Sequence, residues 1–162
     1  GEGGVGYAFN NGSVVKTFPH IEDQLRWVKL GGEAYAAAGI QIPGDPNREG
    51  GPHVVGAKGV MPAGAKGLGL SDAEVLAVVC HERFDLAGAD KAGAFAEEYA
   101  LWCAPDSPVY AALEAGTATF DDVHEKVADG RLVDETSLAF LSAGVDDLIR
   151  QADRADNLAR AA

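Results

Sequence analysis

The sequence predicts an all-α protein with long loops. Apolar side chains recur at Ile21, Leu25 and Val28, a spacing that places them on one face of a helix. A second helix start is marked by Ser71 and Glu74, which form the pattern of a capping box in front of an apolar run. No segment alternates apolar and polar residues with the period of two that a half-buried strand needs.

The composition and charge of the chain limit its class and its partners. Its 162 residues, 47% of them hydrophobic, suffice for one domain, or for one small domain with an appendage, around an apolar core. The net charge of -12 repels phosphate groups, so we expect no nucleic acid and no anionic membrane as a partner, but a protein with a basic surface. No run approaches the roughly 18 apolar residues of a membrane span.

Residues 1–16 are rich in glycine and asparagine and show no regular period. The chain begins with neither an initiator methionine nor a basic leader followed by an apolar segment. We therefore expect a mature or trimmed product from which a signal or anchor has been removed. The expected location is extracytoplasmic, whether secreted, periplasmic or at the cell surface.

The first half of the chain is expected to hold two helices around a long loop. Residues 17–30 should form a helix with Pro19 in its first turn and Gly31-Gly32 as its stop. The loop over residues 39–70 is rich in Gly and Pro, and long ordered loops of this kind usually serve a function or wrap a ligand. The capping box then opens a helix over residues 71–84.

Further helices are expected in the second half of the chain. Residues 89–102 have helical spacing, Ser107-Pro108 is a helix start, and residues 120–127 form a short helix. Residues 136–162 resemble a long terminal helix with an apolar stripe among Asp and Arg side chains. Because this helix is amphipathic but acidic, we expect it to dock a partner helix or a second copy of the chain rather than a membrane.

The two cysteines, Cys80 and Cys103, leave two alternatives: a pair of buried thiols or one disulfide. Each cysteine falls near the end of an expected helix, and an antiparallel helix pair could bring them together. A disulfide would indicate an oxidising compartment. By closing a loop of about 23 residues it would stabilise the fold by roughly 3 kcal/mol.

Met61 is the candidate metal ligand of the sequence. It is the only methionine in the chain, and it precedes Pro62 in a glycine-rich loop. A thioether is a soft ligand that suits haem iron, and Gly and Pro can hold an unusual backbone that presents it. The alternative is a methionine that fills a gap in the core.

The order of segments around Met61 resembles part of a known family. A glycine-rich start, GEGGVGYAF, is followed by TFPHIEDQLRWVKLG, by the long loop, and by GVMPAGAKGLGLSDAEVLAVV. This order resembles the part of a bacterial class I c-type cytochrome that follows its Cys-x-x-Cys-His motif. The resemblance covers residues 1–84, which would form a cytochrome c-like domain, and leaves residues 85–162 as a helical extension.

The resemblance implies an electron-transfer protein rather than an enzyme. Met61 would be an axial ligand of haem iron, and the ring would be walled by Tyr7, Phe18, Trp27 and Val60. The cofactor would be haem c, provided that an attachment segment lies upstream of Gly1. The acidic surface would then steer a basic redox partner.

Two departures from the family pattern support a second interpretation. No Cys-x-x-Cys-His occurs in the chain, so the thioether-forming cysteines, the proximal His and their helix are missing. Apolar faces of the other helices would then be uncovered, which favours an upstream segment or a partner that supplies the missing helix. Tyr7 also stands where the family usually has the Pro whose carbonyl accepts the proximal imidazole N–H. The alternative is therefore a haem-free, cytochrome-like scaffold that acts as a protein-interaction module.

The histidines indicate no zinc site, because none forms an H-x-x-x-H or H-E-x-x-H pair. His53 lies in the loop that would line a haem edge and is an alternative iron ligand. His81 follows Cys80, but adjacent helical residues point about 100° apart, so the two make a poor nucleophile–base pair. We expect no enzymatic activity.

Overall fold

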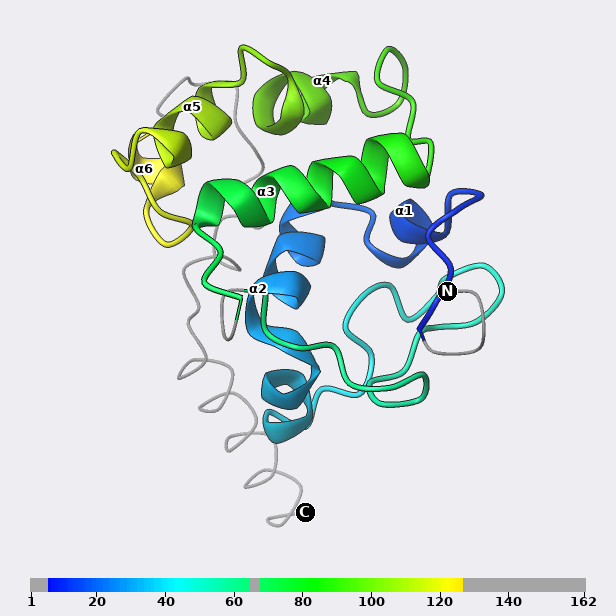
Figure 1. Ribbon diagram of the computed structural model, residues 1–162. Helices are drawn as coiled ribbons and strands as arrows, with labels where there is room; N and C mark the ends of the chain where they lie inside the picture. Colours follow the sequence, from blue (N-terminus) through cyan, green and yellow to red (C-terminus); the bar gives the residue numbers. More distant parts are fainter. Residues whose placement is uncertain (1–5, 65–67, 127–162) are drawn as a thin grey trace, which may run out of the picture.

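The computed structural model of the chain describes residues 6–64 and 68–126 (Figure 1). Within these ranges the elements are helices, and the β-type pairing is limited to isolated bridges at residues 56–59. The expected all-α class with long loops is therefore confirmed for the described residues. The expected terminal helix over residues 136–162 lies outside them.

Helix α2 (Ile21–Ala37) carries the first apolar face. The expected stop at Gly31-Gly32 is confirmed only in part. The backbone leaves the helical conformation at Gly31, where φ is 73° and ψ is 169°, but helical structure resumes and continues to Ala37. This left-handed value of φ is accessible to glycine at little cost, so the chain can break and re-enter the helix there. The sequence also gave no sign of helix α1 (Ser13–Thr17), which is too short to show a period.

Helix α3 (Asp72–Cys80) begins at the expected capping box. The Glu74 amide donates to the Ser71 Oγ at 3.3 Å, and the Ser71 amide donates to a Glu74 carboxylate oxygen at 2.8 Å. This exchange satisfies two of the N–H groups that every helix start leaves free. The helix then widens into a π-helical turn, η2 (His81–Leu86), close to the expected end at residue 84.

The helices after residue 86 are shorter than the sequence predicts. In place of a helix over residues 89–102, helical structure begins only at α4 (Ala96–Glu98) and continues as η3 (Tyr99–Cys103). The Asp90 carboxylate accepts the amides of Ala92 and Gly93, both at 3.0 Å, and this side-chain turn competes with a helix.

The start of α5 (Pro108–Glu114) is confirmed, with Ser107 as its N-cap and Pro108 in its first turn. Helix α6 (Val123–Lys126) occupies only part of the expected residues 120–127.

One hydrophobic core joins the two halves of the chain. Helix α3 crosses the molecule, with α2 packed on one side and η3 and α5 on the other (Figure 1). The core combines side chains from before and after residue 84: Ile21, Leu25, Val28, Ala73, Val75, Leu76, Val79, Trp102, Val109, Leu113, Ala118, Phe120 and Val123. The apolar side chains of η3, α5 and α6 therefore pack in the same core as those of α2 and α3.

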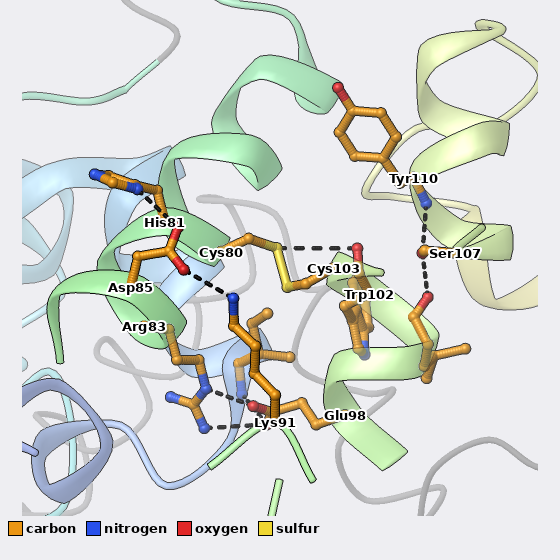
Figure 2. The surroundings of a disulfide bond; sticks show 12 residues. Cys80, His81, Arg83, Asp85, Lys91, Glu98, Trp102, Cys103, Ser107 and Tyr110 are labelled. Atoms are coloured by element: carbon orange, nitrogen blue, oxygen red, sulfur yellow. Dashed lines mark hydrogen bonds and ion pairs between the residues drawn. A yellow bond between two sulfur atoms is a disulfide. The ribbon is translucent and has the colours of Figure 1, made fainter. Parts of the chain in front are cut away.

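The disulfide is confirmed between Cys80 and Cys103, whose Cα atoms are 5.6 Å apart. It joins the end of α3 to the end of η3, as Figure 2 shows. The alternative of two free thiols is therefore wrong for this structure, and neither sulfur is available as a nucleophile. No helix in the described part of the chain is both long and apolar enough to cross a membrane.

Candidate functional site

A cavity of about 370 Å³ lies between α1, α2, the N-terminal segment and the loop that contains Met61. This volume falls within the range of small-molecule sites, and the lining is mostly apolar. The structure brings together in its wall all the residues that the sequence proposed for a cofactor: Tyr7, Phe18, Trp27, Val60 and Met61.

Helix α2 supplies the central part of the cavity wall. Gln24, Trp27 and Val28 are separated by three and four residues, so they share one face of the helix, and all three line the cavity. The Trp27 ring also packs edge-on against Tyr35, with the ring centroids 5.0 Å apart. This contact fixes the indole from the side of the helix that follows the kink.

The loop that contains Met61 is bound to α2 by two backbone hydrogen bonds. The Gly32 amide donates to the Met61 carbonyl at 2.7 Å, and the Gly64 amide donates to the Val28 carbonyl at 2.6 Å. The Gly31 kink makes the first bond possible, because it turns the Gly32 N–H away from the helix ladder. Met61 is thus held between two anchor points.

The backbones of the loop and the helix approach so closely that only glycine fits between them. A Cβ at Gly31 would lie 2.5 Å from the Ala63 nitrogen and 2.8 Å from the Met61 oxygen. A Cβ at Gly64 would lie 2.9 Å from the Val28 oxygen. The position of Met61 at the cavity is therefore set by backbone packing.

A polar cluster of His53, Thr17 and Arg48 lies at the cavity, with Thr17 and His53 in its lining. The His53 ring stacks on Tyr7 with the centroids 3.6 Å apart, and its Nδ1 lies 3.2 Å from the Thr17 Oγ1. Thr17 donates its only hydroxyl proton to the Ser13 carbonyl, and its Oγ1 accepts from the Arg48 Nε. The Thr17 oxygen can therefore only accept from His53, which assigns the proton to Nδ1 and leaves a lone pair on Nε2.

Burial, followed by the nearby Arg48 guanidinium, lowers the pKa of His53 from 6.5 to about 4. The imidazole is therefore neutral at pH 7. A neutral imidazole with a lone pair on Nε2 has the form in which histidine binds metals.

One residue of the cavity lining, Gln24, has a buried acceptor without a partner in the described part of the chain. The Gln24 side chain, which is 2% exposed, donates from its Nε2 to the Glu82 carboxyl at 3.0 Å. Its Oε1 is buried and has no hydrogen-bond partner within the described residues. Burial also raises the pKa of the Glu82 carboxyl.

Apolar side chains surround the mouth of the cavity. Val60, expected as a wall residue, lines the cavity but is 63% exposed, and Phe9 is 42% exposed. Val54, on the same lining, is also exposed. A ligand in this cavity would keep one edge near the solvent, next to an apolar rim.

Other candidate residues lie outside the cavity. His81 pairs with Asp85 at 3.0 Å on the surface beside the disulfide, as Figure 2 shows. No group of three or more His, Cys, Asp or Glu side chains that could hold a metal occurs within residues 6–64 and 68–126.

Sequence analysis missed Gln24, Thr17, Arg48 and Glu82 as parts of the site. The one available signal was at Gln24, a polar residue on the same helix face as Trp27 and Val28.

Comparison of the chain with protein-family models, with curated proteins and with solved structures gave no match. The cytochrome-like fold expected from the sequence therefore remains a prediction.

Gly31→Ala should destabilise the protein by about 1–3 kcal/mol more than Gly39→Ala does. Both glycines have nearly the same φ, 73° and 72°, but an added Cβ meets the Met61 loop only at Gly31. Urea unfolding of the two variants measures the difference. Equal losses of stability would contradict the close seating of the loop on α2.

In the protein without a bound ligand, the His53 ring should titrate near pH 4. An NMR pH titration of the ring measures this midpoint. Because its pKa is lower in the folded than in the unfolded state, the folded protein binds fewer protons between about pH 6.5 and pH 4. Its contribution to stability therefore falls as the pH is lowered through this window, and the wild type should lose stability faster than His53→Gln. A midpoint near 6.5 would contradict the half-buried position of the ring beside Arg48.

Proposed function

We propose that the cavity binds haem and that the protein transfers electrons. The observation that carries this proposal is the position of Met61, whose loop is anchored at the edge of an apolar cavity walled by Phe18 and Trp27. A thioether is one of the axial ligands that proteins provide to haem iron. Bound haem would supply a one-electron redox couple.

The residues of the cavity fit haem as a ligand without a covalent link. Met61 offers sulfur, and His53 offers a neutral imidazole in the same cavity. The aromatic side chains of the wall would limit the contact of bound haem with water, which would raise the effect of the protein dipoles on it. Cys80 and Cys103 are bonded to each other, so neither can form a thioether bond to haem. A covalent attachment would need cysteines beyond those of this chain.

The charge distribution supports a basic redox partner. Residues 1–70 carry six Lys and Arg and six Asp and Glu, whereas residues 71–162 carry seven and nineteen, so the second part has the entire net charge of -12. An acidic region of this size steers basic partners in a salt-dependent way. The disulfide supports an extracytoplasmic location, since such bonds persist in oxidising compartments.

A second candidate function is that of a haem-free interaction module. The absence of Cys-x-x-Cys-His from the chain and the exposed apolar side chains of Phe9, Val54 and Val60 favour it. In this case the rim of the cavity would contact a protein partner.

The visible absorption spectrum and the intact mass of protein purified from its native source separate the two functions. A Soret band supports electron transfer, and a mass beyond that of these 162 residues would in addition support an attachment segment outside this sequence. A colourless protein at the mass of the 162 residues contradicts electron transfer and leaves the interaction module.

In the haem complex, Met61→Leu should lower the reduction potential, because thioether ligation raises the potential of haem iron. The substitution keeps the apolar volume and removes the sulfur. Leu68→Ala, a change at an exposed residue of the same loop, is the control and should leave the potential unchanged. Spectroelectrochemical titration measures all three proteins. Equal potentials for wild type and Met61→Leu would exclude Met61 as a ligand.

A further inference from the structure

The Arg83 guanidinium connects the cavity wall to the helices that follow residue 84. The side chain is 0% exposed and belongs to η2. Its Nη1 donates to the Phe18 carbonyl at 2.7 Å, and its Nη2 donates to the Pro19 carbonyl at 2.8 Å. These two carbonyls form the junction between α1 and α2, and Phe18 lines the cavity.

Glu98 of α4 completes this connection. Its carboxylate forms an ion pair with the Arg83 Nε and accepts from the Arg83 Nη2 at 3.0 Å, as Figure 2 shows. The same carboxylate accepts the amide of Ile21, the first residue of α2, at 3.0 Å. His20, the N-cap, provides no side-chain bond, so Glu98 satisfies an N–H that the helix start leaves free. A negative charge is also favourable at a helix N-terminus.

The aromatic ring of Phe95 adds a third contact from the same segment, 5.1 Å from the guanidinium carbon of Arg83. Phe95 and Glu98 are thus placed around one buried cation. A buried ion pair is weak support for stability, because desolvation offsets most of its attraction and apolar residues can replace it. Apolar residues in these positions could not make the directional hydrogen bonds of the pair. Arg83 donates to the carbonyls of Phe18 and Pro19, and Glu98 accepts from the Ile21 amide, so these bonds fix the orientation of α2 relative to α1.

We propose that the helical segment after residue 84 positions the cavity wall, with Glu98 and Arg83 as positioning residues. Glu98 holds Arg83, Arg83 holds the junction that includes Phe18, and Glu98 orients the first turn of the helix that presents Gln24 and Trp27 to the ligand. In this proposal the helical extension after residue 84 acts at the ligand site, although it is far in sequence from the residues that line the cavity. The proposal rests on the proposed function only for the identity of the ligand.

The test compares Glu98→Gln with Glu97→Gln, a neighbouring exposed glutamate, in the full chain. Hydrogen exchange measured by NMR should show the Ile21 amide exchanging about tenfold faster or more in Glu98→Gln than in Glu97→Gln, because a charge-assisted bond is weakened. The Leu113 amide in α5 should exchange equally in both. Haemin, titrated into each protein, should bind about tenfold more weakly to Glu98→Gln.

Equal exchange of Ile21 in the two variants would overturn the proposal. So would an equal rise at Ile21 and Leu113, which indicates a general loss of stability. If Glu98→Gln does not fold, Glu98→Asp takes its place, since it keeps the charge and shortens the reach to Ile21. If wild type fails to bind haemin, the proposed haem function fails, while the exchange of Ile21 still decides the positioning role.

Discussion

The contact between the Met61 loop and the kink of α2 is the constraint on which the cavity depends. A loop over residues 39–70 could adopt many paths, and its ordering costs conformational entropy. The chain fixes this loop at Gly31-Gly32, where the helix breaks and a free N–H meets the Met61 carbonyl. A second hydrogen bond, from the Gly64 amide to the Val28 carbonyl, also holds the loop against α2. The hollow between the loop, α1 and α2 follows from these two bonds.

Helix α3 and its continuation η2 connect this site with the rest of the molecule. One face of α3 packs against α2, and another packs against η3 and α5. The disulfide joins α3 to η3 covalently. Arg83, one turn beyond the disulfide, then reaches back to the junction of α1 and α2. The cavity is therefore connected by packing and hydrogen bonds to the helices that follow residue 84. The resemblance to a cytochrome covers only residues 1–84.

Features encoded locally could be predicted from the sequence. The Ser71 capping box and the Ser107-Pro108 helix start each depend on residues within a single turn, and the structure contains both. The grouping of Tyr7, Phe18, Trp27, Val60 and Met61 followed from a resemblance, and the structure places them around one cavity.

Features that depend on distant partners could not be predicted. Gly31-Gly32 has the pattern of a helix stop, and it becomes a kink only because the Met61 carbonyl receives the freed N–H. The Asp90 turn replaced a helix through a side-chain interaction that apolar spacing does not reveal. The link from Glu98 to Ile21 joins residues 77 positions apart, and no periodicity marks it.

The central claim is that the fold itself positions Met61 before any ligand binds. The most direct measurement is hydrogen exchange of the Gly32 and Gly64 amides by NMR in the protein without a bound ligand. The account predicts that both amides are protected to a degree similar to the interior amides of α2, because each donates to a carbonyl across the contact between the loop and the helix. Exchange of both amides at the rate of an unstructured chain would show that the loop is not bound to α2, and the account of the cavity would be wrong.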